Sequence, residues 1–260
     1  MSEQNWALIL GASSGFGEAV ALELAARGMN IFGVHLDRRE TLPHAREVEE
    51  NIRKLGREAV FFNGNAADEE KRKEVIAHIH GAFEKTPGTV RVLLHSLAFG
   101  TLKPLVAGDA VVQRQLEMTA DIMGHSLVYW VQELIAHGLM AAGGRIYAMT
   151  SEGSSRAIPQ YGPVCAAKAI LEAHIRQLAL ELAPLGITAN AIMAGVTDTP
   201  ALRKIPGHEQ LIQMARARNP HQRLTTPRDV AKCIGVLCGE DTYWMTGNTV
   251  RVDGGEGSVG

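Results

Sequence analysis

The stretch that decides the fold is Trp6-Ala7-Leu8-Ile9-Leu10-Gly11-Ala12-Ser13-Ser14-Gly15-Phe16-Gly17. It opens with an apolar run, residues 6–10, that is typical of a buried strand. Residues 18–27 then have the alanine, leucine and glutamate content of a helix. Between them, Gly11, Gly15 and Gly17 permit positive φ and a close approach of a diphosphate to the helix N-terminus. This order predicts a dinucleotide-binding turn, although the GxxxGxG spacing differs from GxGxxG and tight packing alone is the alternative.

The rest of the chain repeats this alternation of short apolar runs and longer amphipathic segments. We expect further strands at Asn30–Leu36, Ala59–Phe62, Arg91–His95, Gly144–Thr150, Thr188–Met193 and Thr249–Val252. We expect further helices at Pro43–Leu55, Asp68–Glu84, Thr119–Ala141, Pro163–Ala183 and Pro227–Leu237. Such alternation indicates an α/β fold, a single-domain Rossmann-like doubly wound parallel sheet of about seven strands with helices on both faces. The single dinucleotide-binding domain is expected to span residues 1–260.

Composition excludes several classes of protein. The chain has 260 residues, 26 basic and 28 acidic side chains and 46% hydrophobic residues, so it can bury a core and carries no basic field for nucleic acid. No apolar run is long enough to span a membrane, and the polar start Met1–Asn5 lacks the pattern of a signal peptide. Cys165, Cys233 and Cys238 form no CxxC pair, and the ten histidines show no metal-binding spacing. We expect a cytoplasmic protein with reduced thiols, no metal, and no nucleic-acid or membrane partner.

Three stretches resemble the short-chain dehydrogenase/reductase superfamily, in the same order along essentially the whole chain. They are the GxxxGxG turn, the pair Tyr161 and Lys168 at the start of a helix, and the run Asn190–Gly195 after the sixth strand. Most of these reductases have the pattern YxxxK, but the residue four before Lys168 is Val164, which cannot donate a proton. Here the tyrosine stands seven positions before the lysine, two helical turns away and on nearly the same side. This YxxxxxxK pattern resembles the enoyl-acyl-carrier-protein reductases.

Other positions sharpen the resemblance. The run His95–Phe99 is similar to the HS-aliphatic-x-F run of enoyl reductases, and Met123 stands where ketoreductases carry an active-site asparagine. Many enoyl reductases have a second tyrosine ten residues before the reactive one, where this chain has Ser151. That substitution resembles the branch that typically uses NADPH, as does the loop Thr199–Arg218 within a substrate segment at about residues 196–220. A serine in this region also serves carbonyl reduction, so a 3-ketoacyl or other carbonyl reductase remains the alternative.

The resemblance implies roles for individual residues. Tyr161 is expected to donate a hydrogen bond to the thioester oxygen, and Lys168 to bind the nicotinamide ribose and lower the pKa of the tyrosine. Ser151 is the third candidate catalytic residue, through a hydrogen bond to the thioester. The expected substrate-pocket residues are Phe99, Gly100 and Met123, the side chains of Phe99 and Met123 serving as core or pocket wall.

The expected cofactor is NADP, with NAD as the alternative. Arg38 and Arg39 follow the second strand, where a 2′-phosphate would lie, whereas the preceding Asp37 can prefer the ribose hydroxyls of NAD. Asn65 after the third strand either meets the adenine or serves as an ordinary turn residue. The full set of expected cofactor-binding residues is Gly11, Ser13, Ser14, Gly15, Phe16, Gly17, Arg38, Arg39, Asn65, Ala66, Ser96, Leu97, Lys168, Gly195, Thr197 and Thr199.

The leading functional hypothesis is reduction of the C2=C3 bond of trans-2-enoyl thioesters on acyl carrier protein, in fatty-acid synthesis. A non-catalytic nucleotide-binding sensor is an alternative of another class, against which the presence of both Tyr161 and Lys168 argues. Arg203 and Lys204 could meet an acidic carrier protein, but a solvated helix face explains them equally simply. By resemblance, we also expect a homotetramer.

Overall fold

All strands belong to one parallel sheet. The computed structural model describes residues 4–259, so Met1–Glu3 of the polar start and Gly260 lie outside the described residues. The strands are β1 (Gln4–Leu10), β2 (Asn30–His35), β3 (Ala59–Asn63), β4 (Gly88–His95), β5 (Arg145–Thr150), β6 (Thr188–Ala194) and β7 (Thr249–Val252). Their order in the sheet is β3-β2-β1-β4-β5-β6-β7, and every neighbouring pair is parallel. The predicted Rossmann-like, doubly wound sheet is confirmed.

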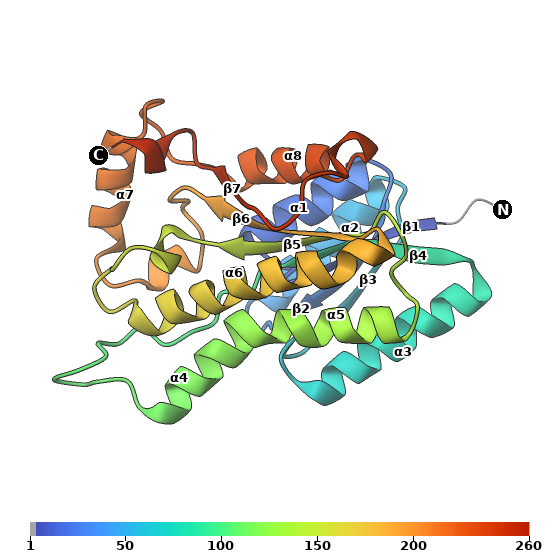
Figure 1. The fold of residues 1–260 in the computed structure, drawn as a ribbon, viewed down its shortest axis with the longest axis horizontal. Coiled ribbons are helices and arrows are strands. Elements are labelled where there is room, and N and C mark those ends of the chain that lie inside the picture. The colour runs from blue at the N-terminus through green and yellow to red at the C-terminus, as the bar shows by residue number, and fades with distance from the viewer. Residues whose placement is uncertain (1–3, 260) are drawn as a thin grey trace.

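Helices cover both faces of the sheet (Figure 1). They are α1 (Gly15–Ala26), α2 (Leu42–Lys54), α3 (Glu69–Lys85), α4 (Gln113–Ala120), α5 (Ser126–Ala136), α6 (Gly162–Leu182), α7 (His208–Arg218) and α8 (Pro227–Leu237). The buried side chains of α1, α2 and α8 form one hydrophobic cluster with one face of the sheet, and those of α3, α5 and α6 form a second cluster with the other. The chain thus builds two apolar layers around a buried sheet, which is how parallel sheets are stabilised.

The order of the strands reverses between β1 and β4. Leu10, the last residue of β1, is in register with Val34 of β2 on one side and with His95 of β4 on the other. The chain leaves β1 and β4 toward opposite faces of the sheet, which opens a crevice beyond their carboxyl ends. The dinucleotide-binding turn predicted from the sequence therefore lies where open α/β sheets bind their ligands.

One predicted helix is wrong. The expected single helix Thr119–Ala141 is instead α4, a π-helical turn at Asp121–His125, and α5, which ends at Ala136. Two side chains bond to the backbone one turn earlier, Thr119 to the carbonyl of Gln115 and Ser126 to the carbonyl of Ile122, both on the helix interior. Such side-chain bonds compete with the regular backbone hydrogen bonds of an α-helix. The apolar periodicity of the sequence does not reveal this competition.

The substrate segment predicted at about 196–220 contains a helix that the sequence analysis did not identify. This helix is α7, and a short 3-10 turn at Leu202–Lys204 precedes it. Within this helix only Ala215 is buried. Its sequence is therefore mostly exposed and shows little of the apolar periodicity that would have indicated a helix. Among residues 4–259, no helix is both long enough and apolar enough to cross a membrane.

Candidate active site

The glycine turn after β1 is built for close backbone approach. Gly11 has φ +93°, and a Cβ atom placed on it would overlap the carbonyl oxygen of Ser96 at the end of β4. A Cβ atom on Gly17 would overlap the carbonyl oxygen of Gly11 itself. The amides of Gly11 and Ala12 both donate to the carbonyl of Val34 in β2, at 2.8 and 3.1 Å. Only glycine fits at both positions, so the turn packs α1 tightly against two strand ends.

The N-terminus of α1 is open toward the crevice. Ser14 precedes the helix in an extended conformation and gives it no side-chain cap. Gly15 has φ +57°, and the methyl group of Thr199, from the segment after β6, lies 3.6 Å from where its Cβ would be. Uncapped amides at the start of a helix bind anions. This glycine cradle fits the diphosphate of a dinucleotide, with Ser13 to Gly17 on one side and Thr199 on the other.

Asp37 lies at the carboxyl end of β2, where a ribose would follow the diphosphate. Burial would raise the pKa of its carboxyl, but interactions with the Ser13 and Thr41 hydroxyls and with His35 outweigh this and lower the pKa. The imidazole Nδ1 of His35 lies 2.8 Å from a carboxylate oxygen of Asp37. Arg38, which follows Asp37, is exposed, as is Arg39. The strand end thus presents one satisfied carboxylate and two solvent-facing guanidinium groups.

The turn after β3 has its polar groups engaged within the protein. The side-chain oxygen of Asn65 accepts from the amide of Ala67 at 3.0 Å. The carbonyl of the buried Ala66 accepts from the indole of Trp130 at 2.8 Å. The turn-residue alternative for Asn65 therefore has direct support, and contact of Asn65 or Ala66 with an adenine stays a prediction.

Lys168 is a buried lysine at the centre of the crevice. Its Nζ donates to the carbonyl of Met149 in β5 at 2.7 Å and to that of Leu97, after β4, at 3.4 Å. Burial lowers the pKa of Lys168 to about 8, and the carboxylate of Glu172 one turn along α6 opposes this. An ammonium has three donor hydrogens. Two are accounted for by these carbonyls, which leaves one for a ligand.

Tyr161 is the N-cap residue of α6, immediately before the helix that carries Lys168. Its own carbonyl accepts from the amide of Cys165 at 2.8 Å and so begins the helix. Burial raises the pKa of the phenol, and the nearby Ser151 hydroxyl partly offsets this. The expectation that Lys168 lowers the pKa of Tyr161 is therefore wrong, because burial dominates and the charge of Lys168 does not contribute to the shift. The Ser151 oxygen is buried and has no partner within hydrogen-bonding distance among the described residues. The two hydroxyls are therefore neighbours that are not bonded to each other, and both retain bonding capacity for a ligand.

An apolar cluster adjoins Tyr161. It contains Val164 and Met123, both buried, with Ile122 and Ala167 and the partly buried ring of Tyr161 packed against them. A Cβ atom on Gly100 would lie 2.8 Å from the sulfur of Met123, so the loop after β4 passes close above this cluster. The structure brings Gly100 and Met123 together, whereas Phe99 is 51% exposed. Contact of these three residues with a substrate stays a prediction.

His95 at the end of β4 has a structural contact. Its Nε2 lies 2.8 Å from the hydroxyl of Ser126, which in turn donates to the carbonyl of Ile122 in the π-helical turn. Burial lowers the pKa of His95 to about 3, and the positive charge of Lys168 contributes. A neutral imidazole therefore ties β4 to the π-helical turn.

The segment after β6 closes the site. The hydroxyl of the buried Thr197 donates to the carbonyl of Gly195 at 2.9 Å. A Cβ atom on Gly195 would lie 2.5 Å from the Thr225 hydroxyl and 2.8 Å from a carboxylate oxygen of Glu256. Sequence reasoning did not identify the partners on this side, Thr225 and Glu256, because they are distant in the chain and belong to no motif. Direct contacts of Gly195, Thr197 and Thr199 with a cofactor stay predictions, as does the contact expected at Ser96.

Comparisons with known proteins agree with this geometry. A family model described as enoyl-(acyl carrier protein) reductase matches residues 11–256. The chain is a short-chain dehydrogenase/reductase. It is therefore an oxidoreductase of a superfamily that uses a nicotinamide cofactor.

Several relatives of this short-chain reductase span nearly its whole length. It is 30% identical over 251 residues to 1-cyclohexenylcarbonyl-CoA reductase of Streptomyces collinus, an alignment covering 95% of this chain and 85% of the relative. The structure of the NADH enoyl-acyl-carrier-protein reductase from Aquifex aeolicus VF5 matches with a TM-score of 0.84 and 25% identity, covering 99% and 98% of the two chains. The promiscuous reductase LugOII, which catalyses a keto-reduction, matches with a TM-score of 0.83 and 25% identity over 98% of each chain.

Proposed function

We propose that this short-chain reductase reduces the C2=C3 bond of trans-2-enoyl thioesters. The observation that carries the proposal is the placement of Tyr161 at the N-cap of α6, seven residues before Lys168, beside a buried Ser151 hydroxyl. Val164, four residues before the lysine, is a buried apolar side chain and supplies no hydroxyl. Met123 at the π-helical turn supplies no polar relay either.

The chain's own residues account for stabilisation of the transition state. The nicotinamide would supply the hydride that adds to C3. Negative charge then develops on the thioester oxygen, where the Tyr161 phenol donates a hydrogen bond, and a proton from solvent that adds at C2 removes this charge. A donor held in place beside a developing oxyanion typically contributes about 10²–10³ in rate. Ser151, whose oxygen has no protein partner among the described residues, supplies a second hydrogen-bonding group beside the phenol.

Lys168 is proposed to orient the ribose that carries the nicotinamide. Its bonds to the carbonyls of Met149 and Leu97 fix the ammonium between the ends of β4 and β5. The remaining donor hydrogen is the one available to the ribose hydroxyls. The positive charge also favours the negative charge that develops on the neighbouring oxygen atoms.

We propose NADP as the cofactor. Asp37 is already satisfied by His35 and by hydroxyl neighbours, whereas Arg38 and Arg39 are exposed where a 2′-phosphate would lie. Replacing both arginines by alanine is expected to lower kcat/KM with NADPH by about tenfold or more and to leave kcat/KM with NADH within about twofold. Equal losses with both cofactors would show that the arginines do not recognise a 2′-phosphate and would contradict the proposal.

The thioester class has support from the relatives. The substrate named for the Streptomyces collinus relative, a 1-cyclohexenylcarbonyl thioester of CoA, is an α,β-unsaturated thioester. The Aquifex aeolicus enzyme acts on the same bond type carried by acyl carrier protein. Lys204 is exposed and suits an acidic carrier, but Arg203 is already paired with Asp198 at 2.8 Å. We propose acyl carrier protein as the carrier and fatty-acid synthesis in the cytoplasm as the setting.

Carbonyl reduction is the second candidate, and a specific observation favours it. A tyrosine phenol and a serine hydroxyl side by side fit a keto oxygen as well as a thioester oxygen, and Ser151 lies in that place. The similarity to LugOII, a keto-reducing enzyme, points the same way.

Steady-state kinetics separate the candidates. We expect turnover of crotonyl and octenoyl thioesters, on CoA and on acyl carrier protein, with kcat/KM at least about tenfold above that for acetoacetyl thioesters. Turnover of acetoacetyl thioesters with no oxidation of NADPH or NADH by enoyl thioesters would refute the proposal. A protein that binds the dinucleotide and is inert with every thioester and carbonyl compound would be the nucleotide-binding sensor.

A further inference from the structure

Arg218 joins three segments that are far apart in the chain. It is the last residue of α7, and its Nη2 lies 2.9 Å from an oxygen of Glu152 and 3.2 Å from an oxygen of Glu256. Glu152 directly follows Ser151 at the end of β5, and Glu256 lies near the C-terminus. One guanidinium nitrogen thus bridges two carboxylates, one of which is adjacent in sequence to a candidate catalytic residue.

Glu152 is the centre of this ion network. Besides Arg218, it has Arg251 at 3.3 Å and Arg156 at 3.5 Å, and only 19% of its side chain is exposed. A carboxylate that is partly buried and shared among three guanidinium groups is held in one position. The short 3-10 turn Glu152–Ser154, which leads from Ser151 toward Tyr161, is therefore fixed from outside the site.

Glu256 connects the same arginine to the segment after β6. Its carboxylate is buried, and one oxygen accepts from the amide of Val196 at 3.1 Å while the other faces Arg218. A second bond ties the same parts together, since the side-chain amide of Asn219 donates to the carbonyl of Asp253 at 2.9 Å. The C-terminal turn therefore fastens the start of the substrate segment, at Val196, and its end, at Arg218.

Arg218 is the group that lets the two carboxylates lie together. Burial raises the pKa of Glu256 and the charge of Glu152 raises it further, while the Val196 amide and the charge of Arg218 oppose this. Without the guanidinium, two nearby carboxylates would repel each other in a poorly solvated place. The simplest relief is separation of α7 and the C-terminal turn from the Ser151 turn.

We propose that Arg218 is a positioning residue that fastens the substrate segment, residues 196–220, to the turn that carries Ser151. It sets the distance between the thioester-binding segment and the hydrogen-bond donors Tyr161 and Ser151. The kinetic part of this inference rests on the proposed thioester reduction. The structural part, that Arg218 holds the substrate segment in place, does not rest on that proposed function. The kinetic and the structural parts can therefore fail separately.

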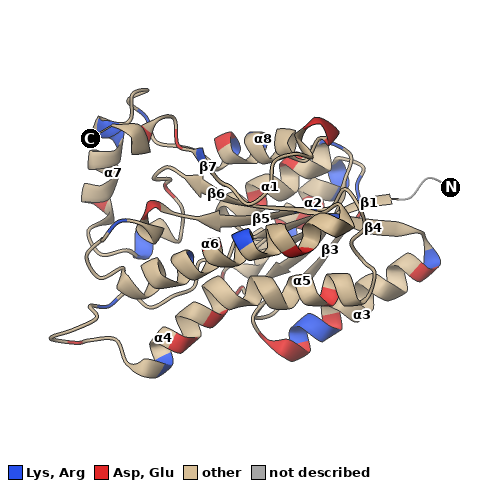
Figure 2. Cartoon of the chain, viewed as in Figure 1, with Lys and Arg blue, Asp and Glu red and all other residues tan. Residues whose placement is uncertain are grey.

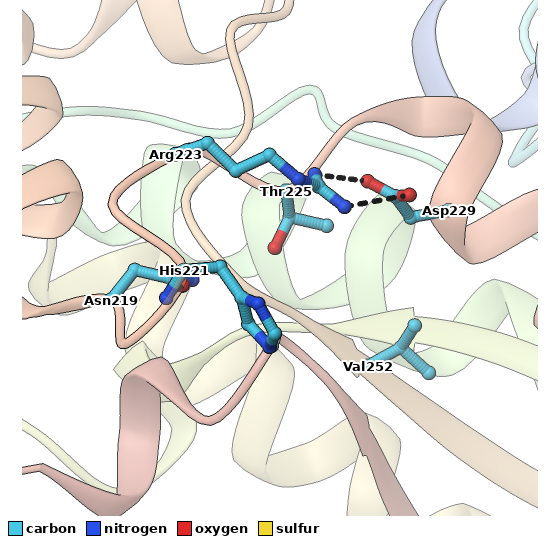
Figure 3. Close-up of a pocket in the computed structure, with 7 residues that line it drawn as sticks. Asn219, His221, Arg223, Thr225, Asp229 and Val252 are labelled. Atoms are coloured by element: carbon cyan, nitrogen blue, oxygen red, sulfur yellow. Dashed lines mark hydrogen bonds and ion pairs between the residues drawn. The ribbon is translucent and has the colours of Figure 1, made fainter.

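The first test is the Arg218→Gln variant, assayed with octenoyl thioester and the preferred nicotinamide cofactor. Loss of two charge-assisted hydrogen bonds is expected to raise KM for the thioester about tenfold, and the dissociation constant of the dinucleotide less than about twofold. Arg223→Gln is the matched control, because Arg223 forms a two-bond ion pair with Asp229 six positions along the chain (Figure 3). Among the described residues, Arg223 forms no ion pair with Glu152. The control variant should leave both constants unchanged.

The second test is charge rescue. In the double variant Arg218→Gln with Glu256→Gln, one carboxylate is removed while an amide oxygen can still accept from Val196. We expect this double variant to recover at least about half of the lost thioester affinity, since the repulsion between Glu152 and residue 256 is gone. An arginine that only filled space would give additive losses and no rescue.

The third test needs no substrate. The segment contains Arg203 and Lys204, both exposed, which trypsin can cut when the segment detaches. Arg218→Gln is expected to be cut there at least about tenfold faster than the wild type, and the double variant at an intermediate rate. Unchanged cleavage together with an unchanged KM would overturn the inference. If no thioester is reduced, faster cleavage still supports the fastening of the segment and only the proposed function fails.

Discussion

Tyr161 is the residue on which the proposed chemistry depends. The N-cap position places its phenol outside the regular helix, beside the Ser151 hydroxyl and the apolar cluster around Met123. Burial keeps the phenol protonated, because it raises the pKa above the ordinary value of about 10. A protonated phenol in a water-poor site is a hydrogen-bond donor throughout the physiological pH range.

Removing the phenol hydroxyl tests that role. Tyr161→Phe is expected to lower kcat by about 10²–10³ with little change in the dissociation constant of the dinucleotide, because the lost bond forms at the developing oxyanion. Tyr129→Phe is the matched control, since the Tyr129 hydroxyl donates to Asp121 at 3.1 Å and belongs to none of the predicted site residues. Stopped-flow and steady-state kinetics measure both, and a full rate for Tyr161→Phe would remove the tyrosine from the mechanism.

Lys168 predicts a pH dependence with a definite sign. Burial lowers its pKa to about 8, so the ammonium loses its proton as the pH rises through about 8 rather than near 10.5. The affinity for the dinucleotide is therefore expected to fall progressively above about pH 8. Lys168→Arg keeps its charge over this range and should remove the inflection even if it binds more weakly. Titration of tryptophan fluorescence checks this, and a wild-type affinity that is flat to pH 9.5 would contradict it.

At the scale of elements, the strands and the glycine turn were predictable because each depends on neighbours in sequence. Apolar runs and glycine positions located all seven strands and the cradle between β1 and α1. The spacing of Tyr161 and Lys168 was equally local, since seven residues make two helical turns. The split of the helix at Asp121–His125 and the network around Arg218 were not predictable. The split depends on a bond from the Ser126 side chain to the backbone. The network depends on the partners of Arg218, Glu256 and Glu152, which are 38 and 66 residues away in the sequence.

A methyl group on Gly17 tests the packing of the glycine turn between β1 and α1. Gly17→Ala would place a Cβ atom on the carbonyl oxygen of Gly11, so we expect a lower Tm and loss of the thermal stabilisation that the dinucleotide gives. Gly81→Ala in α3 is the control, because nothing lies within 4 Å of the added atom. The control should bind normally and gain up to about 1 kcal/mol from helix propensity. Thermal unfolding with and without NADPH measures both, and equal behaviour of the two variants would refute the cradle.

At the scale of the whole molecule, the surface carries both signs of charge. Figure 2 shows basic and acidic residues interspersed along α3 and α4 in this view, which agrees with a net charge of −2. Tyr243 and Trp244, between α8 and the edge strand β7, are 64% and 86% exposed. Large aromatic side chains are costly to leave in water. Their exposure suits the homotetramer that is expected from the family resemblance.

Sedimentation tests the assembly. The purified chain is expected to sediment at four times the 28.0 kDa of one chain, and Trp244→Lys to shift the mass toward smaller species without changing the far-ultraviolet circular dichroism. Val236→Lys, at an exposed apolar position on α8, is the control and is expected to leave the mass unchanged. A wild-type chain that sediments as a monomer at micromolar concentration would contradict the expected tetramer.

The identity of the reduced bond is tested most directly by the position of the transferred hydrogen. Octenoyl thioester is incubated with the enzyme and a nicotinamide cofactor deuterated at the reactive carbon, and the product is analysed by mass spectrometry and NMR. The account predicts a saturated octanoyl thioester with one deuterium at C3, and a rate that falls by about 10²–10³ in Tyr161→Phe. Recovery of unchanged enoyl thioester, while acetoacetyl thioester is reduced to a 3-hydroxy product under the same conditions, would contradict it.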